Sequence, residues 1–176
     1  MNPRPASVGF CVRLAIQDDV SGIGAVALAL EGWSLDEHIR GASAEIEMQQ
    51  ERDPVRLVMV AEVEGIIAGY GRARYDETPD GMQSESFPEG WYLSGLLVAP
   101  EFRRNGIGLE LTRQRVVWIG KRAQLIRFHT NATNFASIAL HEKLGFKEIG
   151  RDILVTTRKR QLGPEILYEL RLERRA

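Results

Sequence analysis

The alternation of apolar and polar positions predicts the first elements of the chain. Residues 12–16 alternate with the period of two that a half-buried strand requires. Asp18-Asp19 can cap a helix running to about residue 30, because its apolar positions recur at helical spacing. A second helix is expected over residues 34–52, and Pro54 then ends it.

The middle of the chain has the pattern of a hairpin followed by a central strand. Apolar runs over residues 55–63 and 66–75 flank Glu64-Gly65, a sequence typical of a tight hairpin turn. Residues 76–90 contain two prolines and read as a long exposed loop. The almost continuous apolar run over residues 91–99 suits a strand that is buried on both faces.

The second half alternates helices with strands. We expect helices over residues 106–120 and 134–144, and strands over residues 125–130, 147–157 and 166–173, the last two on either side of Gly163-Pro164. A chain of 176 residues in this order predicts one α/β domain over residues 1–176, with a mixed central sheet flanked by helices.

Composition and charge narrow the function classes. The chain has 23 basic and 24 acidic residues and a net charge of −1, which is unlike a bulk nucleic-acid binder. No apolar stretch is long enough to span a membrane and no signal-peptide core opens the chain, so we expect a cytoplasmic protein. Residues 17–90 carry 16 acidic and 5 basic side chains, whereas residues 91–176 carry 8 acidic and 16 basic ones. This division suggests ligands of opposite charge, and solvated helix faces are the plainer explanation.

The turn after the central strand predicts a pyrophosphate site. Arg103-Arg104-Asn105-Gly106-Ile107-Gly108 joins a buried strand to a helix. The first N–H groups of a helix lack intrahelical partners, and glycines let them approach an anion closely. The motif has neither the three glycines of a dinucleotide fingerprint nor the Gly-Lys-Ser/Thr of a P-loop. An ordinary strand–turn–helix connection with incidental arginines is the alternative.

Two separate motifs resemble those of one family. Arg103-x-x-Gly106-x-Gly108, behind a strand ending in Val98-Ala99-Pro100, is similar to the acetyl-CoA motif of the GNAT N-acetyltransferase superfamily. The segment from Asn131 to Phe146, with Asn134 and the sequence Leu-His-x-Lys-x-Gly-Phe, resembles that superfamily's second block. The resemblance covers about residues 12–157 in the family's order of elements.

The resemblance implies a sheet that splays to admit acetyl-CoA. It implies that backbone groups of Leu96, Leu97 and Val98 pair with the pantetheine, and that the Val98 N–H faces the thioester carbonyl. It assigns the pyrophosphate to residues at the start of the helix, and the pantetheine arm to polar residues of the later helix. These are Arg103, Arg104, Asn105, Gly106, Ile107, Gly108 and Leu109, then Asn134 and Ser137.

His141 is the predicted general acid. Asn134, Ser137 and His141 share one helical face, and Gly145 fits the left-handed position just past the helix end, with Phe146 packing back. Most members of the superfamily that this chain resembles carry Tyr at the position of His141. The resemblance implies that this residue protonates the leaving thiolate. Imidazole can also act as an acid, and a histidine that only packs on the coenzyme is the alternative.

The general base is left open by the sequence. The segment Tyr92-Leu93-Ser94-Gly95 resembles one in aminoglycoside-modifying members, which carry Glu where this chain has Ser94. Ser94 cannot be the base alone, so a water held by Ser94 or Tyr92, or a carboxylate at Glu89 or Glu85, remains a candidate. His129 and Arg127 alternate with Ile126 and Phe128 along a strand. We expect His129 to be a satisfied structural histidine, and a histidine that lines the cleft is the alternative.

The predicted function is direct transfer of acetyl from acetyl-CoA to a primary amine of a cationic small molecule. Cys11 lies far in sequence from the cleft motifs, so no nucleophile is evident, and the three histidines lack the spacing of a metal site. We therefore expect no metal, no nucleic acid and no membrane partner. A non-catalytic acyl-CoA-binding module and a protein N-acetyltransferase are the alternatives, and the resemblance leaves a homodimer open.

Overall fold

The computed structural model describes residues 9–28, 34–77, 88–156 and 161–173. Their strands form a seven-stranded mixed sheet in the order β1-β2-β3-β4-β5-β7-β6, flanked by four helices, which confirms the predicted fold class. Contacts divide the chain into two compact units: residues 1–72 with 95–114, and residues 73–94 with 115–176. Each unit is described by itself below.

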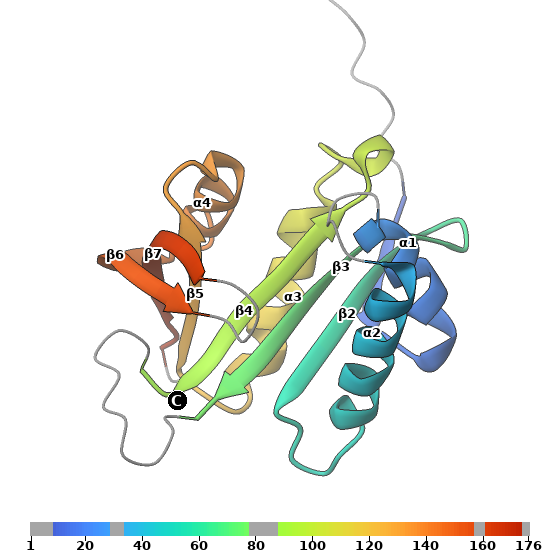
Figure 1. The fold of residues 1–176 in the computed structure, drawn as a ribbon, viewed down its shortest axis with the longest axis horizontal. Helices are drawn as coiled ribbons and strands as arrows, with labels where there is room; N and C mark the ends of the chain where they lie inside the picture. Colours follow the sequence, from blue (N-terminus) through green and yellow to red (C-terminus); the bar gives the residue numbers. More distant parts are fainter. Residues whose placement is uncertain (1–8, 29–33, 78–87, 157–160, 174–176) are drawn as a thin grey trace, which may run out of the picture. The chain divides into compact units, whose positions relative to one another are not determined.

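The first unit begins with β1 (Cys11–Leu14), the short helix η1 (Gln17–Asp19), α1 (Val20–Leu28) and α2 (Leu35–Gln49). Asp18 and Asp19 do not precede α1 as its cap but lie within η1, where the Asp19 carboxylate reaches back to accept a hydrogen bond from the Ile16 N–H at 2.9 Å. Ser34 and Glu37 form a capping box at the start of α2. Figure 1 shows α2 running alongside β2 (Arg56–Val63), against which it packs.

A hairpin and residues 95–114 complete the first unit. Glu64 and Gly65 connect β2 to β3 (Ile66–Asp76) with positive φ values of 49° and 82°, the conformation of a two-residue hairpin turn. The core lies between the helices and the sheet. It consists of Ala15, Val20, Ile23, Val26, Ala27, Ala42, Ile46, Val58, Val60, Tyr70 and Ala99.

The second unit is built on β5 (Leu125–Asn131). β4 (Gly90–Val98) pairs with it in parallel and β7 (Gln161–Arg171) pairs with it antiparallel, while β6 (Lys147–Thr156) lies outside β7. β7 begins before the predicted strand, and Pro164 lies inside it opposite Leu154. The end of α3 (Ile107–Gly120) and all of α4 (Phe135–Glu142) belong to this unit.

Side chains alternate between two faces in the second unit. Phe128 of β5 stacks on Tyr168 of β7, and Trp91 of β4 packs edge-on against Trp118 of α3. Because neighbouring positions of a strand point to opposite faces, Arg127 and His129 lie on the face away from Phe128. We call the face that carries Phe128 the helix face and the face that carries His129 the outer face.

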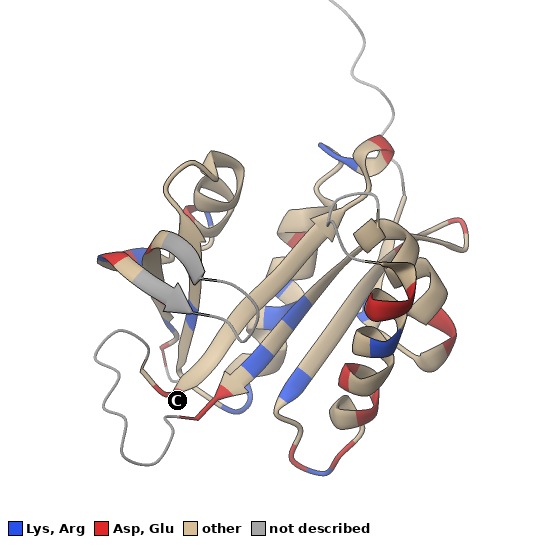
Figure 2. Ribbon diagram, viewed as in Figure 1, with Lys and Arg blue, Asp and Glu red and all other residues tan. Residues whose placement is uncertain are grey.

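Four of the 16 acidic residues in the acidic part of the chain, residues 17–90, lie on one helix. Asp36, Glu37, Glu45 and Glu47 belong to α2, and Figure 2 shows the acidic positions following that helix. Asp36 and Glu47 are exposed. This part of the acidic charge therefore fits the plainer explanation of a solvated helix face. Of the acidic segment before β4, Asp76, Glu77 and Glu89 are described, whereas Asp80 and Glu85 lie outside the described residues.

Candidate active site

The turn between β4 and α3 adopts the conformation that its glycines permit. Arg104 and Gly106 have φ values of 66° and 86°, in the left-handed region. A Cβ on Gly106 would meet no atom within 4 Å, so glycine is needed there for the backbone conformation and leaves the space beside it open.

The start of α3 offers unused N–H groups. Within the described residues, the N–H groups of Ile107, Gly108 and Leu109 have no backbone acceptor, and the first helical bond runs from the Glu110 N–H to the Gly106 carbonyl at 3.0 Å. A helix N-terminus also carries a partial positive charge. These donors fit a pyrophosphate, which is the chemistry predicted for this turn.

The polar side chains of the turn brace it. Arg103 donates from Nε to the Val98 carbonyl at 3.0 Å, and Asn105 donates to the carbonyls of Phe102 and Arg103, both at 3.2 Å. Arg103 and Arg104 are exposed. Their phosphate contacts, and the pantetheine contacts of the half-buried Leu96, Leu97 and Val98, stay predictions.

Asn134 and Gly145 delimit α4 as the sequence predicts. The Asn134 side chain accepts a hydrogen bond from the Ser137 N–H at 3.3 Å and so caps the helix. At the other end Gly145 has a φ of 90°, its N–H donates to Glu142 and the Phe146 N–H donates to the His141 carbonyl at 3.2 Å. This pair of bonds is a Schellman motif, and it fixes the backbone of His141.

His141 is buried on the helix face of the second unit. Its ring stacks on Phe128 with centroids 3.7 Å apart and meets Phe146 edge-on at 5.3 Å. Its Nδ1 lies 2.8 Å from the Ser137 carbonyl oxygen. A carbonyl oxygen only accepts, so Nδ1 carries the hydrogen and Nε2 of the neutral ring carries the lone pair.

The charge state of His141 follows from its burial. Burial lowers the pKa of His141 to about 4, although the Ser137 carbonyl opposes this shift and the Arg115 guanidinium adds to it. The imidazole is therefore neutral at neutral pH. Its Nε2 is buried and has no hydrogen-bond partner among the described residues. Because buried polar atoms are normally hydrogen-bonded, a reacting group could serve as the partner of this nitrogen.

Tyr92 and Ser94 lie where β4 separates from β5. Within this unit the β4–β5 ladder pairs Trp91 with Ile126 and Tyr92 with Arg127, and no residue beyond them. The buried Tyr92 hydroxyl donates to the Pro88 carbonyl at 2.6 Å, and burial raises the pKa of this phenol. The Ser94 carbonyl accepts from Arg115 at 3.2 Å.

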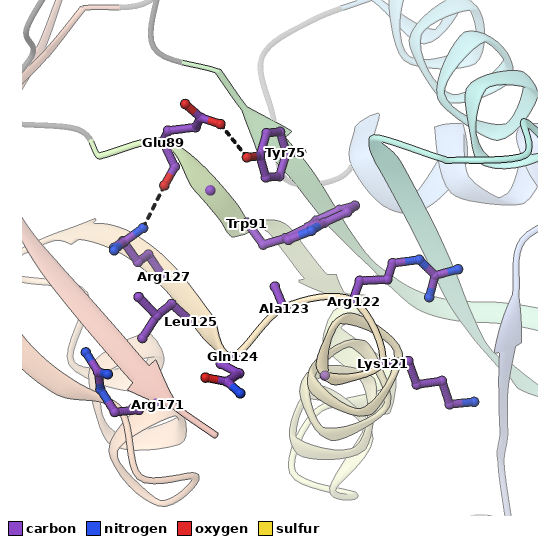
Figure 3. Close-up of a pocket in the computed structure, with 12 residues that line it drawn as sticks. Tyr75, Glu89, Trp91, Lys121, Arg122, Ala123, Gln124, Leu125, Arg127 and Arg171 are labelled. Carbon is purple, nitrogen blue, oxygen red and sulfur yellow. Dashed lines mark hydrogen bonds between the residues drawn. The ribbon is translucent and has the colours of Figure 1, made fainter. Parts of the chain in front are cut away.

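Glu89 lies near the other end of β4, beside a cavity of about 600 Å³ (Figure 3). Tyr75 donates to its carboxylate at 2.5 Å, and Arg127 donates to its backbone carbonyl at 3.0 Å. Five residues of extended chain separate Glu89 from Ser94, a span of about 17 Å. The structure therefore does not bring Glu89 and Ser94 together.

The comparisons with known proteins agree with this geometry. A model of the Acetyltransferase (GNAT) family matches residues 13–146. The chain belongs to the GNAT acetyltransferase family.

One curated relative and two solved structures illustrate the membership. An aminoglycoside N(6')-acetyltransferase type 1 of Acinetobacter baumannii is 39% identical over 62 residues, which cover 34% of this chain and 42% of that protein. A ribosomal-protein-alanine N-acetyltransferase of Brucella melitensis shares the fold with a TM-score of 0.69 and 22% identity, over 92% of this chain and 99% of that one. The yncA protein of Salmonella typhimurium, solved with its cofactor acetyl-CoA, has a TM-score of 0.68 and 20% identity, over 95% and 96% of the two chains.

Two groups of this GNAT domain were not anticipated from its sequence. Arg115 is fully buried on α3, where burial lowers its pKa to about 9, and it contacts the Ser94 carbonyl. The sequence does contain a sign that Arg115 is buried. Arg115 falls in a series of positions four residues apart whose other members, Ile107, Leu111 and Ile119, are all buried. The second group is the pair His129 and Glu165 on the outer face, which satisfies His129 as expected.

None of the helices in the described part of this GNAT chain is long and apolar enough to cross a membrane. Among those same residues, His, Cys, Asp and Glu side chains form no group of three that could hold a metal ion.

Proposed function

We propose that this protein transfers the acetyl group of acetyl-CoA directly to a primary amine of a cationic small molecule. The observation that carries the proposal is the turn at residues 103–108, which presents unused N–H groups behind a left-handed glycine. Such donors recognise the pyrophosphate of a coenzyme without any particular side chain. The yncA neighbour, solved with acetyl-CoA, supports the same ligand.

Direct attack by the amine is the simplest route for the transfer. Cys11 is an exposed free thiol on β1, the edge strand, and β1 is separated from β4 by β2 and β3. Three strand spacings amount to about 14 Å. A ternary complex of acetyl-CoA and amine therefore needs no covalent enzyme intermediate.

The acceptor is proposed to be cationic. The described residues that flank β4 on its amino-terminal side include three carboxylates, Asp76, Glu77 and Glu89, and the relative from Acinetobacter baumannii is named for an aminoglycoside, a polycation. Negative charge raises the local concentration of a cationic substrate. Polyamines and aminoglycosides are the acceptor classes that fit.

His141 is proposed to pass a proton to the leaving thiolate. Because Nδ1 is held by Ser137, the proton must enter and leave at Nε2. We expect His141→Ala to lower kcat much more than it raises the KM for acetyl-CoA, and His141→Tyr to keep part of the activity. A normal kcat in His141→Ala would reduce this residue to a packing role.

The deciding experiment measures binding and turnover separately. Calorimetry gives the affinity for acetyl-CoA, and thiol release is followed with a panel of polyamines, aminoglycosides, neutral amines and basic peptides. Turnover confined to cationic small molecules supports the proposal.

Two other outcomes correspond to the alternatives. Binding without turnover across the panel would favour a non-catalytic acyl-CoA module. Turnover confined to peptides would favour a protein N-acetyltransferase, the activity for which the Brucella melitensis neighbour is named.

A further inference from the structure

His129 occupies the first outer-face position beyond the end of the β4–β5 ladder. The last pair is Tyr92 with Arg127. Side chains on one face recur every second residue, so the next outer-face positions are Ser94 on β4 and His129 on β5. The Tyr92 and His129 rings meet edge-on with centroids 6.4 Å apart. His129 therefore lies where the two strands part.

A carboxylate from the neighbouring strand orients the His129 ring. β7 pairs Leu167 with His129, and Glu165, two residues earlier, lies on the same face. Its carboxylate contacts Nδ1 of His129, and the two side chains are 17% and 9% exposed. An ionised carboxylate only accepts, so Nδ1 donates and Nε2 of the neutral ring keeps the lone pair.

Side chains from three strands lie beside His129 on the outer face. They are Tyr92 of β4, Arg127 of β5 and Glu165 of β7. Arg127 is itself paired with Glu169 of β7 at 2.9 Å, whereas the Glu165 carboxylate contacts the imidazole.

We propose that His129, oriented by Glu165, is the general base that deprotonates the acceptor amine; this role rests on the acetyl transfer proposed above. An imidazole fixed by a buried carboxylate is the arrangement by which proteins prepare a base. The other candidates fit less well. The Glu89 carboxylate is bound by Tyr75 near the far end of β4, and the Tyr92 hydroxyl already donates to Pro88.

Every proton of the proposed acetyl transfer is accounted for. Nε2 of His129 takes one proton from the ammonium group of the acceptor. The neutral nitrogen attacks the thioester carbonyl carbon, a C–N bond forms and the C–S bond then breaks. The proton that the nitrogen loses on collapse goes to the sulfur through Nε2 of His141. The products are an N-acetyl amide, coenzyme A as a thiol and one proton, which His129 releases to water.

The test separates a base from a structural ion pair that only ties β5 to β7. It compares wild type with His129→Gln, His129→Ala, Glu165→Gln and the matched control Glu169→Gln. Glu169 lies on the same face of β7, and its carboxylate pairs with Arg127. Thermal unfolding and the acetyl-CoA Kd are recorded for each variant before the pH dependence of kcat.

His129→Gln is expected to keep the acetyl-CoA Kd within about twofold and to lower kcat by about 100-fold or more, with loss of the acid limb of the pH profile. Added imidazole should restore part of the rate of His129→Ala. Glu165→Gln should lower kcat about tenfold, because the imidazole loses the carboxylate that orients its ring. Glu169→Gln should leave the acid limb in place.

Three results would overturn the role, and each has a different meaning. An active wild type whose kcat and pH profile survive in His129→Gln would remove His129 as the base and leave the acetyl transfer intact. A wild type that binds acetyl-CoA and acetylates no amine would remove both. A fall in thermal stability with an unchanged pH profile would assign the pair a structural role only.

Discussion

The turn at residues 103–108 and the end of the β4–β5 ladder present different kinds of polar group. The turn uses backbone N–H groups held by a left-handed glycine, and its side chains mainly brace the loop. The ladder end uses side chains, His129 on the outer face and His141 on the helix face, each with one ring nitrogen held by an oxygen. A phosphate ligand needs several fixed donors, whereas a moving proton needs one ring nitrogen with a defined tautomer.

The largest effect is expected where a side chain intrudes on the backbone site. Gly108→Asp places a carboxylate among the donors that should hold the pyrophosphate. We expect the affinity for acetyl-CoA to fall about 100-fold, a loss of about 2.7 kcal/mol, while the fold survives. Calorimetry measures the affinity. Gly41→Asp is the control, because a Cβ there meets nothing within 4 Å; an equal affinity in both variants would remove the pyrophosphate assignment.

The second largest effect is expected for the pH dependence of stability, through the buried side chain of His141. The pKa of His141 is about 6.5 in the unfolded chain and about 4 in the fold, so between these values the unfolded chain binds more protons. Stability is therefore lost as the pH falls through this window, and going from pH 7 to pH 5 should cost about 2 kcal/mol. Urea denaturation at both pH values measures the loss. His141→Phe, which keeps the stacking on Phe128, should lack this part of the dependence; the same loss in both proteins would refute it.

A smaller effect separates the two uses of Asn134. Its side chain caps α4, so Asn134→Ala should lower the free energy of unfolding by about 1 kcal/mol, and Asn134→Ser should restore most of it. Chemical denaturation of the three proteins measures the difference. A rise in the acetyl-CoA KM of the stable Asn134→Ser variant would add the predicted pantetheine contact. Equal destabilisation by Ala and Ser would argue against the cap.

The smallest effect concerns the charge before β4. Raising the salt concentration from 50 to 200 mM should lower kcat/KM for a cationic acceptor about threefold, because the attraction is screened. Changing both Glu85 and Glu89 to Gln should reduce this salt dependence through KM. Glu85 lies outside the described residues, so Glu89→Gln alone is the structurally defined variant. Efficient turnover of a neutral amine, insensitive to salt, would contradict the steering.

Features set by neighbouring residues were predictable from the sequence. The hairpin at Glu64-Gly65, the start of a helix at Asn134 and the left-handed Gly145 each depend on two to six consecutive residues, and all three are confirmed. The turn at residues 103–108 is equally local, so its glycines were recognised directly. Turns and helix ends of this kind can be predicted without knowing the tertiary fold, because the residues that form them are neighbours in the sequence.

Features set by distant residues were not predictable. His129 and Glu165 are 36 positions apart, and the register that joins β5 to β7 cannot be read from either strand. On α3 the spacing of the sequence places Leu109, Thr112, Val116 and Ile119 at helical steps of three and four. The buried stripe instead includes Arg115, because a buried arginine looks like a surface residue in a hydropathy pattern.

The alternation of side chains along β5 has a consequence for how this enzyme family could diversify. His129 and Phe128 are adjacent in sequence, yet one belongs to the outer face and the other carries His141 on the helix face. Under the proposed roles, β5 carries the two proton-transfer groups on opposite faces. Substitutions on the outer face would then change the surroundings of the acceptor amine and leave the surroundings of His141 unchanged.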